Sequence, residues 1–140
     1  MARSTIRHIA IVTKNPIKLA DFYQAAFGME IRAKITTKEG HEYAFVTDGH
    51  ITMALLQSTL IHDMPPGINH IGFKVENMEE TIKTLMALGC ERPLERPSDR
   101  PYAELRTADI DGNLIDLSEA GYERSKAQGV TVTEEHVPAE

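Results

Sequence analysis

The sequence predicts an α+β fold of two βαβββ modules whose strands form curved mixed sheets. Three observations lead to this prediction. An apolar strand pattern occurs twice, an amphipathic helix pattern follows each copy, and three short strand-like runs follow each helix. Such an internal repeat indicates that each copy is one structural unit.

The repeated strand pattern opens each module. It lies at Arg7–Val12 in the first module and at Asn69–Lys74 in the second, and the second residue of both copies is a histidine. The offset between His8 and His70 is 70 − 8 = 62 residues. Both segments are rich in apolar residues, which favours strands in the interior of the fold.

The helices are expected at Pro16–Phe27 and at about Met78–Leu88. Each follows an asparagine that can cap it, Asn15 or Asn77, and 77 − 15 is again 62 residues. Each helix is expected to end at a glycine. The residues expected on the apolar faces are Leu19, Ala20, Tyr23 and Phe27 in the first helix, with Phe22 and Ala26 on its flank, and Met78, Ile82, Leu85 and Met86 in the second.

Strand-like runs separated by turn residues follow each helix, which is typical of antiparallel sheets. The pairs Asp48-Gly49 and Asp111-Gly112 mark the last turn of each module. The expected strands are Met29–Thr36, Glu42–Val46 and Ile51–Gln57 in the first module, and about Glu91–Leu94, Tyr102–Thr107 and Leu114–Ser118 in the second.

A chain of 140 residues fits one domain, which we expect at residues 1–120 with modules at 6–57 and 68–119. Between the modules, Ser58–Gly67 reads as a linker because it contains two prolines and a glycine. From Gly121 onward the chain is polar and lacks periodicity, so residues 121–140 are predicted to be a polar C-terminal tail.

Composition excludes several classes of partner. A formal net charge of −6 without a run of Lys or Arg disfavours nucleic acid, since that binding depends on neutralising phosphates. The apolar runs are strand-sized and the N-terminus has no signal-peptide core, so we expect a cytoplasmic protein away from membranes. The single cysteine, Cys90, cannot form an internal disulfide and is expected to be a small buried apolar residue.

His8 and His70 are the first candidates for chemistry. Both faces of the strand around His8 are apolar, and a buried histidine needs a hydrogen-bond partner or a metal. One such histidine alone would be read as a packed core residue. Two at equivalent places in duplicated modules favour a shared site instead.

Asp116 supplies a carboxylate on the last expected strand. An acid between apolar neighbours is costly unless it is paired or ligates a cation, although Asp116 alone could also face solvent at a strand end. Together, the three residues predict a divalent metal held by His8, His70 and Asp116 in a metal-binding cavity that the sheets enclose.

Three sequence features resemble the vicinal-oxygen-chelate superfamily. They are the repeated His-Ile-Ala/Gly strand, the helix end from Asp21 to Gly28, and the closing stretch Asp109–Leu117. That superfamily includes glyoxalase I, methylmalonyl-CoA epimerase, extradiol dioxygenases, fosfomycin-resistance enzymes and bleomycin-binding proteins. The resemblance covers about residues 6–119, and it is specific for the superfamily without selecting a member.

The resemblance implies metal ligands on the first and last strands of each module. Those places are His8, Ala54, His70 and Asp116, since 54 + 62 = 116. Ala54 cannot bind a metal. Aligning the two Asp-Gly turns instead puts Met53 there, and a thioether is a poor ligand for a hard cation. The fourth ligand is missing either way.

The carboxylate position also departs from the superfamily, where Glu is usual and this chain has the shorter Asp116. Glu119 is a possible substitute, but strand alternation places it on the face opposite Asp116. His50 lies in a turn and is read as a solvated residue.

Two histidines and one carboxylate form the ligand set of non-haem Fe(II) oxygenases. The leading hypothesis is a metal-dependent enzyme on a small substrate that chelates the metal through neighbouring oxygens, leaning to an iron dioxygenase. With Mn²⁺, Ni²⁺, Co²⁺ or Zn²⁺ it would be a glyoxalase- or epimerase-like lyase or isomerase. The third hypothesis is a metal-free, antibiotic-sequestering binding protein, which the alanine at position 54 favours.

Tyr102 and Glu104 are the candidates for proton transfer, because they alternate with Arg106 on one face of an expected strand; Glu42 is a further candidate. Each could equally be a residue at the rim. The resemblance also implies a homodimer.

Overall fold

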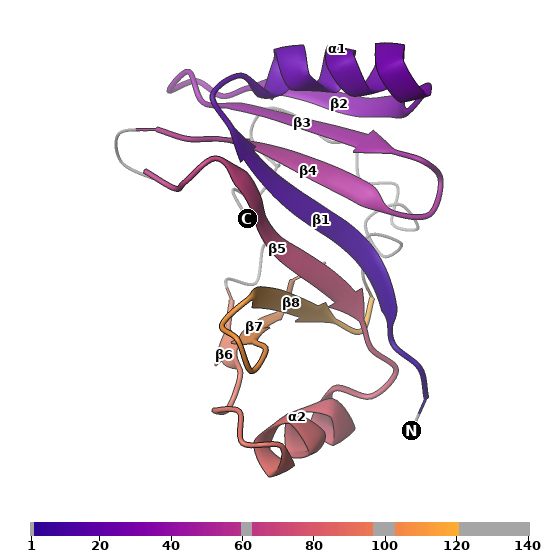
Figure 1. The fold of residues 1–140 in the computed structure, drawn as a ribbon, viewed down its shortest axis with the longest axis vertical. Coiled ribbons are helices and arrows are strands. Elements are labelled where there is room, and N and C mark those ends of the chain that lie inside the picture. The colour runs from indigo at the N-terminus through magenta and orange to yellow at the C-terminus, as the bar shows by residue number, and fades with distance from the viewer. Residues whose placement is uncertain (1, 60–62, 97–102, 121–140) are drawn as a thin grey trace. The chain divides into compact units, whose positions relative to one another are not determined.

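The structure is a computed structural model of the chain, and it describes residues 2–59, 63–96 and 103–120. Within these residues eight strands and two helices follow the order β1-α1-β2-β3-β4-β5-α2-β6-β7-β8 (Figure 1). The order is βαβββ twice, as expected. The α+β class with two βαβββ modules in mixed sheets is therefore confirmed.

The described residues fall into two compact units. One contains His8–Asn69, and the other contains residues 2–7 together with the residues from His70 onward. The units follow the two sequence modules closely, with a boundary that falls within the first strand of each. A single domain over residues 1–120 stays a prediction, and the proposed tail at 121–140 lies outside the described residues.

The first module consists of β1 (Thr5–Thr13), α1 (Pro16–Phe27), β2 (Glu30–Thr36), β3 (Glu42–Thr47) and β4 (Thr52–Gln57). Its strands lie in the order β2-β3-β4-β1. The pairs β2–β3 and β3–β4 are antiparallel, whereas β1 and β4 are parallel. The first and last strands of the module are therefore neighbours, and α1 makes the crossover that a parallel pair requires.

Helix α1 begins where the sequence predicts. The side chain of Asn15 accepts a hydrogen bond from Lys18 N at 3.0 Å, and Gly28 ends the helix with φ 70°, a left-handed conformation that favours glycine. The helix packs over the sheet of its module (Figure 1). The buried residues of this core are Ala20, Ala44, Val46 and Leu55.

The apolar face of α1 was predicted wrongly at its C-terminal end. Phe27 is 69% exposed and Phe22 is 55% exposed. Their rings pack against each other and against Tyr23, with centroids 5.5–6.3 Å apart, so the aromatic side chains contact one another instead of filling the core. Among the described residues of the helix, Pro16 and Ala20 are the buried ones.

The second module consists of β5 (Gly67–Lys74), α2 (Met78–Ala87), β6 (Leu94–Glu95), β7 (Leu105–Ala108) and β8 (Leu114–Ser118). Its strands lie in the order β5-β8-β7-β6. Strands β5 and β8 are parallel, and the other neighbours are antiparallel. The arrangement repeats that of the first module.

Two strands of this module differ from the prediction. Strand β6 is Leu94–Glu95, not 91–94, because Pro93 has no N–H to donate to a ladder. Strand β7 begins at Leu105, so Glu104 lies before the strand, and Tyr102 lies outside the described residues.

Helix α2 is capped by Asn77, whose side chain accepts from Glu80 N at 3.0 Å. It ends one residue earlier than predicted, and of its expected apolar face only Ile82 is buried, while Met86 is 47% exposed. No helix in the parts of the chain that the structure describes is long and apolar enough to cross a membrane.

Candidate metal centre

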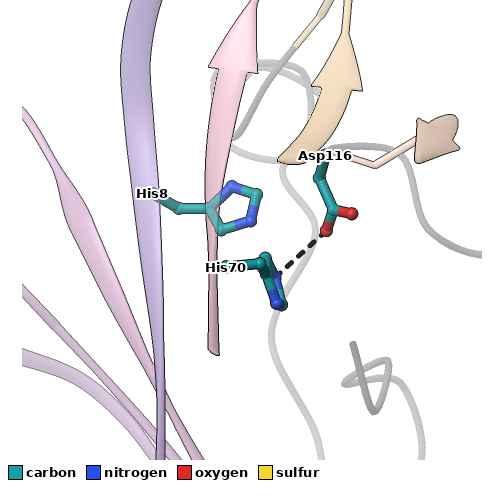
Figure 2. A group of neighbouring side chains, drawn as sticks. All are labelled: His8, His70 and Asp116. Carbon is teal, nitrogen blue, oxygen red and sulfur yellow. Dashed lines mark ion pairs between the residues drawn. The ribbon is translucent and has the colours of Figure 1, made fainter. Parts of the chain in front are cut away.

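His70 and Asp116 face each other from the parallel strands β5 and β8. In the register of these strands Asp116 lies opposite Gly72, two residues after His70 on the same face. Because Gly72 has no side chain, the Asp116 carboxylate can reach diagonally to the imidazole. His70 Nε2 lies 3.1 Å from Asp116 Oδ2, and the two side chains are only 2% and 1% exposed (Figure 2).

Arg106 engages the other oxygen of the same carboxylate. It lies opposite Asp116 on the antiparallel strand β7, and its Nε donates to Asp116 Oδ1 at 2.6 Å. Its Nη2 lies 3.5 Å from His70 Nδ1, and its side chain is 20% exposed. The carboxylate is thus held between an arginine and a histidine.

These contacts assign the protonation state of the imidazole. A guanidinium has only donors, so the Nη2 contact requires a lone pair on His70 Nδ1. The ring proton then lies on Nε2, where it points at Asp116 Oδ2. A cation bound at Nε2 would replace this proton.

His8 lies on β1 and is 2% exposed. One ligand atom from each of His8, His70 and Asp116 lies within 4.8 Å of the other two, and Figure 2 shows the three side chains together. These residues could hold a metal ion. They are the three that the sequence singles out.

The donor set fits a divalent transition metal. Nitrogen and oxygen ligands lie about 2.0–2.2 Å from such an ion, so two of them at a right angle are about 3 Å apart. The 3.1 Å between His70 Nε2 and Asp116 Oδ2 matches that spacing. Imidazole and carboxylate donors suit Fe, Mn, Co, Ni and Zn.

Ala54 takes, in the first module, the place that Asp116 has in the second. Ala54 pairs with Ala10 in the parallel ladder, as Asp116 pairs with Gly72, and both pairs differ by the repeat offset of 62. The register therefore favours Ala54 over Met53 as the equivalent position. The first module has no ligand there.

Phe45 takes the place of Arg106. It pairs with Ala54 in the antiparallel ladder, as Arg106 pairs with Asp116. Phe45 is 6% exposed and Ala54 is 5% exposed. The two modules thus carry an apolar pair and an ionic pair at the same position.

The turn of the β7–β8 hairpin is closed by Asp109. Its carboxylate accepts from Asn113 Nδ2 at 2.8 Å and from the backbone N–H groups of Asn113 and Asp111, both at 2.9 Å. The side-chain hydrogen bond from Asn113 and then the backbone ones lower the pKa of Asp109. This turn sets the register that brings Arg106 opposite Asp116.

Sequence reasoning missed Arg106 as the partner of Asp116. The signal was present, because residues paired across an antiparallel hairpin have a constant sum of numbers. The turn pair gives 109 + 113 = 222, and 106 + 116 is also 222. Arg106 was considered only as a neighbour of the proton-transfer candidates.

The alternatives to these ligands lie elsewhere. Glu119 is exposed, and its Oε2 accepts from Met78 N at 2.7 Å at the positive end of α2. His50 is exposed in the β3–β4 turn, as predicted.

Glu104 is half-buried, and its carbonyl accepts from Arg96 N at 2.9 Å. Because it precedes β7, its expected alternation with Arg106 along a strand was wrong. Cys90 is half-buried rather than buried, with its Sγ 3.8 Å from Ala108 O.

Sequence comparison identifies the class of protein that this fold and site indicate. The profile of the Glyoxalase/Bleomycin resistance protein/Dioxygenase superfamily matches residues 5–117, and the chain belongs to this superfamily. This confirms the resemblance seen in the sequence. Among curated proteins, none matches the chain.

Solved structures share the fold at low sequence identity. A hypothetical protein from Bacillus halodurans is 19% identical with a TM-score of 0.62, over 83% of this chain and 94% of that one. Methylmalonyl-CoA epimerase from Mycobacterium tuberculosis is 17% identical with a TM-score of 0.59, over 80% and 85%. A mutant 4-hydroxymandelate synthase from Streptomyces coelicolor is 18% identical with a TM-score of 0.58, over 82% and 48%.

Proposed function

We propose that the protein is a metal-dependent enzyme whose small substrate chelates the metal through two neighbouring oxygens, with His8, His70 and Asp116 as the protein ligands. The observation that carries the proposal is the buried group of two imidazoles and one carboxylate, with ligand atoms within 4.8 Å of one another. Membership of a superfamily that is named for glyoxalases and dioxygenases supports it.

Three protein ligands leave coordination positions open for a substrate, as in non-haem Fe(II) oxygenases, so an iron dioxygenase is the activity we favour. A bound ion would supply a Lewis acid and a template at the site. His70 and Asp116 would hold it on one side of their own contact. Arg106 keeps the Asp116 carboxylate turned so that Oδ2 faces His70.

Glu104 and Tyr102 are our proposed residues for proton transfer. Glu104 is half-buried two positions before Arg106, within reach of the same region of the chain. We expect Glu104→Gln to lower turnover of a loaded substrate complex without changing metal content. A fall in metal content would show instead that Glu104 supports the site.

A lyase or isomerase of the glyoxalase or epimerase type is the second activity to test, with Mn²⁺, Ni²⁺, Co²⁺ or Zn²⁺ as the ion. The shared fold with methylmalonyl-CoA epimerase supports it. Against it stands Ala54, which removes the fourth ligand position of the first module.

A metal-free binding protein is the rival of a different class, and one contact favours it. The charge of Asp116 is already balanced by Arg106 at 2.6 Å without any ion. In that case His8 and His70 would be packed core residues, and the binding of a small molecule would not depend on them.

Metal analysis separates these proposals. Protein purified without chelator should contain about one divalent transition ion per chain, and His8→Ala and His70→Ala should each lose it. His50→Ala is the matched control, because His50 is exposed and outside the site. Trace metal in the wild type, with ligand binding unchanged in both variants, would decide for the binding protein.

Oxygen uptake then distinguishes the activities. With Fe²⁺ and a panel of catechols and vicinal diols, a dioxygenase consumes one O₂ for each substrate molecule that disappears. Substrate conversion without oxygen uptake would favour a lyase or isomerase.

We further propose that the protein is a cytoplasmic homodimer that binds no nucleic acid. The superfamily resemblance and the formal net charge of −6 support these assignments. Light scattering of the purified protein should give twice the chain mass of 15.6 kDa. A mass of one chain would contradict the dimer.

A further inference from the structure

We propose that the Arg106 guanidinium is a built-in counter-cation of Asp116, which keeps the site folded without metal and weakens its affinity for a divalent ion. The inference rests on the proposed metal site. It concerns a residue that would not itself bind the ion.

The first step is the charge of Asp116. This side chain is 1% exposed, and a buried carboxylate needs compensation by a cation or by several hydrogen bonds. Arg106 Nε supplies a charge-assisted hydrogen bond to Oδ1 at 2.6 Å. The chain therefore carries a permanent positive charge at the carboxylate, whether or not an ion is bound.

The second step is the place of that charge relative to an ion. An ion between His70 Nε2 and Asp116 Oδ2 would contact the second oxygen of the carboxylate that Arg106 already holds. Arg106 Nη2 is also 3.5 Å from the other nitrogen of the His70 ring. Because water is excluded from this region, repulsion between the guanidinium and a divalent ion is only partly screened.

The third step comes from the internal repeat. Where the second module has Arg106 and Asp116 in register, the first has Phe45 and Ala54. Both charges are present in one module, and both are absent from the other. This supports a role of the arginine that is tied to the carboxylate and not to the strand pairing, which an apolar residue serves equally well.

The test is Arg106→Met, which keeps the length of the stem and removes the charge. Binding of Mn²⁺ and Zn²⁺ by titration calorimetry should become tighter by on the order of tenfold or more. The melting temperature without metal should fall by about 10 °C, since a buried carboxylate loses its partner. Saturating metal should restore most of that loss.

Two control variants isolate the charge. Arg106→Lys keeps a cation and should bind both ions within about threefold of the wild type. Arg32→Met makes the same change in net charge at an exposed pair with Glu30 and should leave affinity and melting temperature unchanged.

A double variant keeps the test decisive if Arg106→Met does not fold. Arg106→Met with Asp116→Asn leaves no buried charge, so it should be more stable than Arg106→Met alone. Equal instability in both backgrounds would overturn the proposal, because the arginine would then act away from Asp116.

The remaining outcomes separate this inference from the proposed function. If the wild type binds metal and Arg106→Met binds it equally well or more weakly, the inference is wrong and the metal site stands. If only Arg106→Met binds metal, the counter-cation role is supported and the wild type is not a metal enzyme. If neither variant binds metal, both proposals fail.

Discussion

Asp116 lies directly across the β7–β8 ladder from Arg106, and the arginine donates from Nε to Oδ1 at 2.6 Å while His70 faces Oδ2 at 3.1 Å. One buried carboxylate thus has two partners, one on each neighbouring strand. The arrangement depends on Gly72, which leaves the space that the carboxylate crosses to reach His70.

Asp116→Asn should lower the affinity for Mn²⁺ and Zn²⁺ by about 100-fold or more, because a neutral amide is a weaker ligand for a cation than a carboxylate. Titration calorimetry measures the loss. Asp21→Asn is the matched control, since it removes the same charge from an exposed pair with Lys34. Equal affinity of Asp116→Asn and the wild type would remove Asp116 from the ligand set.

Ala54→Asp should destabilise the fold by about 3 kcal/mol, because it buries a carboxylate beside Phe45 without a counter-cation. Urea unfolding at neutral pH measures the change. Ala26→Asp places the same residue on the exposed side of α1 and should cost less than about 1 kcal/mol. A stable Ala54→Asp variant would mean that the first module can hold a carboxylate as the second does.

The repeat made most of the fold predictable. Asn15 and Asn77 located both helix starts, and the Asp-Gly pairs located the final hairpins, because capping and tight turns depend on the residues at those positions alone. His8, His70 and Asp116 were found because polar residues inside apolar strands need a partner.

Other features depend on packing that periodicity does not encode. Phe27 has the spacing of a core residue, yet it lies on the exposed end of α1 against Phe22. The pairing of Arg106 with Asp116 depends on the length of the turn, which runs over residues 109–113 in the second module and 48–51 in the first. The difference of one residue aligns Arg106 with Phe45.

Leu55→Ala should cost about 3 kcal/mol, because Leu55 is fully buried at the centre of the first module. Phe27→Ala removes a larger side chain but should cost less than about 1 kcal/mol, since Phe27 is 69% exposed. Chemical denaturation of both variants gives the comparison. A larger loss for Phe27→Ala would mean that its ring is covered in the folded protein.

Asp109→Ala should make the stability of the protein less dependent on acid pH. The pKa of Asp109 lies below its ordinary value of 3.8, mainly because of the hydrogen bonds from Asn113. A lowered pKa means that its contribution is present above the ordinary value and is lost as pH falls through the folded value. Wild type and variant should therefore differ most at neutral pH.

Urea denaturation from pH 7 down to pH 2.5 measures this convergence. Asp63→Ala, an exposed aspartate outside the two hairpin turns, serves as the control and should leave the pH profile unchanged. A gap between wild type and Asp109→Ala that stayed constant with pH would show that the carboxylate charge does not stabilise the turn.

X-ray absorption spectroscopy of the Zn²⁺- or Mn²⁺-loaded protein tests the convergence of the three side chains most directly. We predict two imidazoles in the first coordination shell with oxygen at the remaining positions, and one imidazole in His8→Ala and in His70→Ala. A shell of oxygen alone, or two imidazoles that persist in both variants, would contradict the assignment of His8, His70 and Asp116 to a common ion.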